Sequence, residues 1–418
     1  MGATLLENFK EMTKKSKVAG SNSEAEFDVA YSTGFLAMDF INGTTIHVES
    51  KERTFSYTSA GIVDGSCNTI IGRSGSGKST LLMQICGNIV RPFIEKEMDT
   101  MLLIDDLEGS LPQVRKEFLL GLSQDQLDHY VDMRNTGITT ENLFDRLKMI
   151  HDSKLSNKKH YTYDTGFFDT YGNRIFKLIP TVYVVDSLPL LMPQELVDDA
   201  ELGGGMDSSS VAKKNTFLFK KIAQLCKEAN IIFFTINHIL EEINMSFIPK
   251  AAQISGLKQG ERLPGGRAAL YLANNMFRVD DTNTLKESEG YGINGSVVML
   301  TVIKSRTNCT KVSVPLIFNK SEGRFDELLS LFHLAKQEGI FGGAGANLYV
   351  ESLPDVKFGM KSFKNVFLSN PELQQAFAKD IYKILSGYLA DTRRMSADTS
   401  NSIMSLNNMV MDFANSVE

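Results

Sequence analysis

Short apolar runs alternate with amphipathic stretches through the middle of the chain, between Gly61 and Phe318. Some of these runs are rich in β-branched residues and have the length of strands; they lie at residues 68–71, 101–104, 181–185, 231–236 and 297–303. Near-continuous apolar strands separated by helical periods are typical of a parallel sheet that is covered on both faces. The pattern therefore predicts an α/β fold with a mainly parallel sheet between helices.

The segments on either side of this core have other patterns. Residues 1–31 open with a short helical period followed by the polar run SNSEAEFD, which predicts an N-terminal arm ahead of a core at 32–320. Residues 321–388 carry two amphipathic helix patterns around a Gly-rich hairpin, which predicts a small α+β C-terminal domain. Residues 389–418 are rich in Ser, Asn and Met, and we expect a flexible tail.

Three polar stretches interrupt the predicted core. Residues 150–179 are polar, aromatic and rich in turn formers, which favours a surface hairpin or insertion. Residues 192–210 and 239–266 are long, carry glycines and follow predicted strands. Long glycine-bearing loops at strand ends are typical of mobile functional loops.

The composition narrows the class of protein. Of the 418 residues, 42% are hydrophobic and 22% are charged, which indicates a soluble globular chain. No stretch reaches the ~18 apolar residues of a membrane span, and the charged start is unlike a signal peptide, so we expect a cytoplasmic protein with no membrane partner. The four cysteines are far apart, which argues against a disulfide framework or a zinc site. A net charge of −6 excludes nucleic-acid binding by bulk positive charge.

The strongest chemical signal is the run GRSGSGKS at residues 72–79, which satisfies GxxxxGK[ST] between a predicted strand and a predicted helix. In such a loop, backbone N–H groups surround phosphate oxygens, Lys78 reaches the β and γ phosphates, and the Ser79 hydroxyl ligates Mg²⁺. The alternative is a chance Gly/Ser turn. The motif predicts ATP and Mg²⁺ as cofactors, with nucleotide contacts from Gly72, Arg73, Ser74, Gly75, Ser76, Gly77, Lys78, Ser79 and Thr80.

Polar residues at the ends of three other predicted strands could complete such a site. Asp186 ends TVYVVD and is expected to hold Mg²⁺ together with Ser79, although a strand-end Asp-Ser turn is the simpler alternative. Glu108 follows MLLIDD and has the reach to orient an attacking water, although it could belong to a solvated acidic turn. His238 ends IIFFTINH, where it could sense the γ-phosphate, but a lone histidine is more often structural.

Taken together, these segments resemble the RecA family of recombinases, and within it most closely the phage UvsX type, over roughly residues 32–388. The segments that carry the resemblance are STGFLAMD at 32–39, GIVDG at 61–65, the phosphate loop, DLE at 106–108, VVDSLPLL at 184–191, INH at 236–238, GGRAAL at 265–270 and KSRTN at 304–308.

The resemblance implies a RecA-like P-loop ATPase that forms helical filaments on single-stranded DNA and promotes homologous pairing and strand exchange. Glu108 would activate water, and His238 would act as a switch. Lys304 and Arg306 would reach the nucleotide of the adjacent subunit, and residues 1–31 would form an oligomerisation arm. The implied partners are single- and double-stranded DNA, further copies of the chain, a loading mediator and a single-strand-binding protein. A phage origin would place the protein in the host cytoplasm.

The resemblance also implies that the two glycine-bearing stretches are DNA-binding loops. The expected DNA-binding residues are Met192, Met206, Phe247, Lys250, Lys258, Arg262, Gly265, Gly266 and Arg267. Between residues 239 and 267 four basic and three acidic residues give a net charge of only +1, and the first loop is acidic. A charge this low, or negative, gives only weak attraction to the phosphates of a DNA strand.

Two alternatives from the same core remain open. One is an ATP-switched scaffold on single-stranded DNA, or a regulatory paralogue without strand exchange. The other is a RecA-fold helicase motor, although nothing in the chain resembles a primase-binding N-terminal domain. Strand-exchange assays separate the first alternative from a recombinase, and rings rather than filaments would identify the second.

Overall fold

The structure, a computed structural model, describes residues 29–49, 54–109, 111–136, 138–169, 172–198, 208–241, 256–264, 273–288 and 290–391. Some of the predicted features therefore lie outside the described residues. These are the arm before residue 29, the tail after residue 391, and the candidate DNA-binding residues Met206, Phe247, Lys250, Gly265, Gly266 and Arg267.

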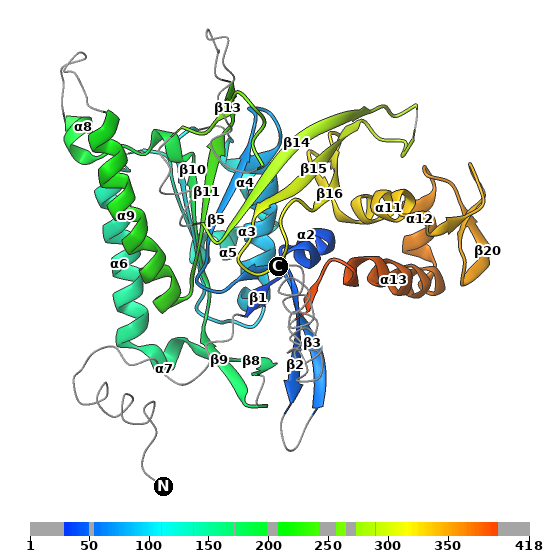
Figure 1. Ribbon diagram of the computed structural model, residues 1–418, viewed down its shortest axis with the longest axis horizontal. Coiled ribbons are helices and arrows are strands. Elements are labelled where there is room, and N and C mark those ends of the chain that lie inside the picture. Colours follow the sequence, from blue (N-terminus) through cyan, green and yellow to red (C-terminus); the bar gives the residue numbers. More distant parts are fainter. Residues whose placement is uncertain are drawn as a thin grey trace, which may run out of the picture.

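A large mixed sheet occupies the centre of the molecule (Figure 1). Among the described residues it has nine strands in the order β17-β16-β15-β14-β5-β11-β10-β6-β7. The parallel part consists of β14 (Asn275–Leu285), β5 (Cys67–Gly72), β11 (Ile231–His238), β10 (Thr181–Asp186), β6 (Met101–Asp106) and β7 (Val131–Arg134). The antiparallel edge consists of β15 (Gly295–Lys304), β16 (Ser313–Asn319) and β17 (Arg324–Asp326). The predicted α/β fold with a mostly parallel sheet is confirmed.

The sheet departs from the prediction at its antiparallel edge. The run at 297–303 was expected to join the parallel sheet, but it lies in β15, which runs antiparallel to β14 and β16. The expectation is wrong because the connection from Leu285 to Gly295 is too short for a helical crossover, which needs about a dozen residues or more. A short connection favours a hairpin.

Helices cover both faces of the sheet. Alternate residues of the central strands point to opposite sides, so each strand contributes to two separate cores. On one face, α3 (Lys78–Ile94) packs against residues such as Ile70 and Ile104. On the other face, α6 (Thr140–Ser156) and α9 (Ser208–Ala229) pack against residues such as Leu103 and Phe233. This double cover explains why the strands are apolar on both sides.

Smaller elements surround the sheet near the start of the described chain and beside the central strands. They are β1 (Ala30–Tyr31), α2 (Leu36–Ile41), β4 (Ile62–Val63), α4 (Gln113–Leu120), α5 (Gln124–Tyr130), η1 (Leu188–Leu190), α8 (Gln194–Asp198), β12 (Leu240–Glu241) and β13 (Glu261–Arg262). No helix among the described residues combines the length and the apolarity needed to cross a membrane.

Two hairpins project from the core and contact each other. One consists of β2 (Thr44–Glu49) and β3 (Thr54–Ser59), and the other of β8 (Thr162–Phe168) and β9 (Arg174–Leu178). The stretch at 150–179 thus contains a hairpin, but it begins inside α6 and includes α7 (Lys158–Tyr161). The Tyr57 hydroxyl donates to the Phe168 carbonyl at 2.6 Å, and the Tyr57 ring stacks on Phe167.

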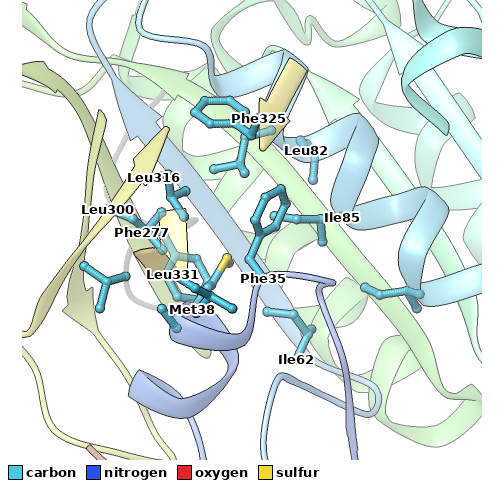
Figure 2. Packing of buried hydrophobic residues seen from close by; sticks show 14 of the residues in the cluster. Phe35, Met38, Ile62, Leu82, Ile85, Phe277, Leu300, Leu316, Phe325 and Leu331 are labelled. Carbon is cyan, nitrogen blue, oxygen red and sulfur yellow. The ribbon is translucent and has the colours of Figure 1, made fainter. Parts of the chain in front are cut away.

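The C-terminal elements form a layer beside the antiparallel edge, at the right of Figure 1. They are α11 (Glu327–Gln337), β18 (Phe341–Gly342), β19 (Leu348–Val350), β20 (Leu353–Phe358), α12 (Phe363–Ser369) and α13 (Pro371–Ser386). After α13, β21 (Ala390–Asp391) pairs with β2. Leu331 of α11 belongs to the same buried cluster as Phe35 and as Phe277 of the sheet (Figure 2). Residues 324–326 form β17 of the main sheet, so the sheet extends past residue 320.

Candidate functional site

The carboxyl ends of four neighbouring parallel strands meet at one edge of the sheet. Gly72 of β5 is in register with His238 of β11, and Asp186 of β10 is in register with Asp106 of β6. In open α/β sheets this edge is where ligands bind. The predicted phosphate loop leaves β5 here and leads directly into α3, as its sequence motif requires.

A cavity of about 300 Å³ opens at this edge. Its lining residues are Ser74, Gly75, Ser76, Gly77, Lys78, Ser79, Thr80, Glu108, Leu111, His238, Asp281, Ser296, Val298, Phe318, Lys320 and Phe325. The structure thus brings most of the phosphate loop together with Glu108 and His238. Gly72 and Arg73 are outside this lining, and Asp186 joins the site through its contact with Ser79.

Two glycines of the loop have backbones that favour glycine. Gly75 has φ = +76° and Gly77 has φ = +86°, a left-handed conformation that costs other residues conformational energy. A Cβ at Gly75 would meet nothing within 4 Å, whereas a Cβ at Gly77 would lie 3.0 Å from Cζ of Phe325. The open space beside Gly75 leaves the backbone accessible to a ligand.

The start of α3 is suited to an anion. Gly77 occupies the N-cap position and no described side chain caps this end, so its backbone N–H groups remain available to a ligand. Lys78 is buried, and its Nζ donates to the Arg73 carbonyl at 2.7 Å. Burial lowers the pKa of Lys78, against the opposing influence of Asp186 and Glu108. A phosphate group could accept from both the lysine and the helix terminus.

Ser79 and Asp186 provide hard oxygen ligands. The Ser79 hydroxyl donates to Oδ2 of Asp186 at 2.6 Å. The pKa of Asp186 is raised to about 6, mainly by burial; the Ser79 hydrogen bond and His238 oppose this rise, and the charges of Asp106 and Glu108 add to it. Oδ1 of Asp186 and Oγ of Ser76 are buried and have no hydrogen-bond partner within the described part of the chain. Such orphaned oxygens are costly, so they fit a site that is completed by a ligand.

These oxygens fit Mg²⁺ better than a metal held by protein side chains alone. The described residues contain no group of three or more His, Cys, Asp or Glu side chains that could hold a metal ion. Mg²⁺ is usually held by one or two protein oxygens, with phosphate oxygens and waters at the other positions. Ser79 and Asp186 could therefore hold Mg²⁺ if a polyphosphate supplies further oxygens.

Glu108, which follows β6, and His238, the last residue of β11, both line the cavity. Oε2 of Glu108 lies 3.2 Å from Nε2 of His238, and both side chains are partly exposed. The backbone N–H groups of Leu107 and Glu108 donate to the Asp186 carbonyl at 2.6 and 3.1 Å. A partly exposed carboxylate beside a phosphate site could accept a proton from water.

Part of the cavity wall consists of residues that no sequence motif indicated. Val298, Phe318 and Phe325 are apolar and come from the antiparallel edge of the sheet, while Lys320, which follows β16, and Asp281 of β14 add charged groups. Apolar side chains with a few polar groups are typical of small-molecule sites, and aromatic faces suit a planar base. The antiparallel edge could not be foreseen as a cavity wall, since its strands come far after the phosphate loop in sequence.

The two predicted basic finger residues lie elsewhere. Lys304 ends β15 and Arg306 follows it, and the described cavity lining includes neither residue. Lys304 pairs with Met276 of β14, which in turn pairs with Thr69, three residues before Gly72. Burial, together with the charge of Arg306, lowers the pKa of Lys304 to about 8. Within one chain these cations are therefore separate from the phosphate loop.

Three of the candidate DNA-binding residues, Met192, Lys258 and Arg262, belong to the described residues. Met192 is half-exposed ahead of α8, and its carbonyl accepts from the Thr140 N–H at 2.9 Å. Arg262 lies in β13, which pairs with β12, and Lys258 lies in the turn before it. The β12–β13 ladder reaches the phosphate loop, because Nη2 of Arg73 lies 2.5 Å from Oε1 of Glu241.

Comparisons with known proteins add no family assignment. A scan against models of protein families finds no match to this chain. A search of curated proteins also finds no match.

Proposed function

We propose that the chain is a DNA-dependent ATPase with a RecA-like core, which assembles into helical filaments on single-stranded DNA and promotes homologous pairing and strand exchange. The observation that carries this proposal is a cavity at the carboxyl ends of β5, β6, β10 and β11. It combines an uncapped helix start with a buried lysine, a Ser–Asp oxygen pair and a carboxylate for water.

Each group has a role that follows from its position. Lys78 and the α3 N-terminus would bind the phosphates, with Ser79 and Asp186 holding the Mg²⁺ that neutralises phosphate charge when bound. Glu108 would orient and deprotonate the attacking water. The apolar wall of Val298, Phe318 and Phe325 is suited to the base.

Contacts between the cavity and the second loop support coupling of nucleotide state to DNA binding. Asn237, next to His238, donates from Nδ2 to the Pro264 carbonyl at 3.0 Å. Arg73 of the phosphate loop is paired with Glu241 of β12. A phosphate that moves His238 or Arg73 would therefore also shift the two ends of the loop that the family resemblance assigns to DNA.

The location of Lys304 and Arg306 supports assembly with the nucleotide between subunits. Because these cations are outside the lining of their own cavity, we expect them to act on the nucleotide of another copy. Cations supplied in trans stabilise charge on a transferring phosphoryl group. A head-to-tail contact of this kind generates an open helical filament when the rotation does not close.

The first test measures ATP turnover with and without single-stranded DNA. We expect DNA to stimulate turnover, Lys78→Ala to abolish nucleotide binding, and Glu108→Gln to lower turnover by about 10²-fold or more while ATP still binds. Glu95→Gln, at an exposed position at the end of α3, is the matched control and should leave turnover unchanged. A DNA stimulation ratio near one would overturn the proposal.

A strand-exchange assay separates the recombinase from a scaffold on the same core. Joint molecules formed by the purified chain with ATP, Mg²⁺ and homologous duplex DNA support the recombinase. Coating of single-stranded DNA without joint molecules, with Glu108 intact, would favour the ATP-switched scaffold or regulatory paralogue.

A further inference from the structure

A buried ion pair lies directly beneath the turn that carries Glu108. Asp106, the last residue of β6, has a side chain that is 2% exposed, and Lys116 of α4 has one that is 8% exposed. Nζ of Lys116 lies 2.5 Å from Oδ2 of Asp106. The other carboxylate oxygen, Oδ1, accepts the Gly109 N–H at 2.8 Å. Asp106 therefore holds a lysine with one oxygen and the Glu108 turn with the other.

The Glu108 turn is fixed by consecutive backbone donors. The N–H groups of Leu107 and Glu108 donate to the Asp186 carbonyl, and the next N–H, that of Gly109, donates to Asp106. Gly109 has φ = +63°, and a Cβ there would meet nothing within 4 Å. The turn thus depends on these hydrogen bonds rather than on packing around Gly109. Its direction determines whether the Glu108 side chain faces the cavity.

Lys116 keeps Asp106 in the state that holds the turn. Asp106 and Asp186 are in register on neighbouring strands, so two carboxylates lie side by side in a buried region. Removing the positive partner of a buried carboxylate leaves an uncompensated charge, which the group relieves by moving toward solvent. That movement weakens the hydrogen bond from Gly109. Lys116 is outside the cavity lining, so we expect it to act on the reaction through Asp106.

We propose that Lys116 and Asp106 are positioning residues for Glu108, and that they hold its carboxylate toward the attacking water. This inference rests on the proposed ATPase function. Within the described part of the chain, neither side chain forms a hydrogen bond with the phosphate loop or with the Ser79 and Asp186 side chains, so nucleotide binding should depend on them little. Their effect should fall on the chemical step, because a small displacement of a reacting group strongly lowers turnover.

The test compares Lys116→Met with wild type in steady-state ATP hydrolysis. We expect kcat to fall by about tenfold or more, with the KM for ATP and the affinity for a non-hydrolysable analogue each within about twofold of wild type. Lys116→Arg, which restores the positive charge, should recover most of the lost turnover. An unchanged kcat, or a parallel loss of kcat and analogue affinity, would overturn the inference.

If Lys116→Met folds poorly, a second variant still tests the inference. Asp106→Asn keeps Oδ1 as an acceptor for Gly109 and removes the charge that Lys116 balances. We expect the double variant Asp106→Asn/Lys116→Met to fold and to lose no more turnover than Lys116→Met alone, since the two residues act as one unit. Additive losses would contradict this.

Lys154→Met is the matched control for loss of a buried lysine. Nζ of Lys154 donates to the Ile179 carbonyl at 2.7 Å, and Lys154 is outside the cavity lining. This variant should keep wild-type turnover per folded molecule. If wild type itself hydrolyses no ATP with DNA present, the proposed function fails and the inference fails with it. If wild type is active and Lys116→Met is equally active, only the inference fails.

Discussion

The three acidic side chains at the end of β6 have very different surroundings. Asp105 points to one face of the sheet, where it accepts from Arg146 and from the Tyr183 hydroxyl. Asp106 points to the other face and pairs with Lys116. Of these three residues only Glu108 lines the cavity, which agrees with its selection from the sequence for the reach of its side chain. Asp105 and Asp106 point to opposite faces because consecutive strand residues alternate, and the partner of Asp106 comes from α4 and left no signal in the sequence.

A buried carboxyl group outside the cavity lining, that of Asp39, predicts a pH dependence of stability. Burial raises the pKa of Asp39 to about 7, against hydrogen bonds from Ser32 and Thr33 that lower it. The folded state therefore binds this proton more tightly than the unfolded state, whose pKa is about 4. The stabilisation from Asp39 is complete below pH ~4 and is lost as the pH rises to about 7, by at most about 1.4 kcal/mol per pH unit.

Denaturant unfolding of Asp39→Asn and wild type between pH ~4.5 and ~7 measures this contribution. The free energy of unfolding of wild type should fall relative to that of Asp39→Asn as the pH rises. The matched control is Asp125→Asn, at an exposed position in α5, which should keep the pH profile of wild type. Parallel profiles for wild type and Asp39→Asn would show that Asp39 does not titrate in this range.

At the scale of elements, sequence patterns located the strands with continuous apolar runs and missed several of the others. The runs in β5, β6, β10 and β11 are apolar throughout, and the structure confirms all four as parallel strands. β14 was not predicted, because its second half, VDDTNTL, is mostly polar and exposed. Whether a strand runs parallel depends on the length of its connection, which an apolar pattern alone does not reveal.

Breaking the contact between the two hairpins should lower the stability of the fold and leave nucleotide binding at the cavity unchanged. Tyr57→Ala removes the hydrogen bond to Phe168 and the stacking on Phe167, so we expect a loss of about 1–3 kcal/mol in the free energy of unfolding. Tyr57→Phe should lose only the part due to the hydroxyl, about 1 kcal/mol.

Chemical denaturation and nucleotide-analogue binding measure the two effects separately. The control is Phe176→Ala, because Phe176 lies on the same pair of strands as Phe168 but is 59% exposed. This variant should stay within about 0.5 kcal/mol of wild type. Equal losses for Tyr57→Ala and Phe176→Ala would mean that the hairpin contact contributes nothing.

For the whole molecule, the net charge of −6 means that attraction to DNA must come from local groups repeated along an assembly. Sequence patterns could indicate the phosphate loop and the residues at the strand ends, because each lies next to its own strand. They could not indicate the cavity wall of Phe318, Lys320 and Phe325, which reaches the phosphate loop only through the order of strands in the sheet. The separation of Lys304 from its own cavity likewise becomes visible only in three dimensions.

Electron microscopy of the purified chain with single-stranded DNA, Mg²⁺ and a non-hydrolysable ATP analogue tests most directly whether nucleotide between copies controls assembly on DNA. We predict open helical filaments that require both the DNA and the analogue and that are absent for Lys78→Ala. Closed rings would indicate a helicase-type motor instead. Separate single particles under all conditions would contradict the proposed assembly altogether.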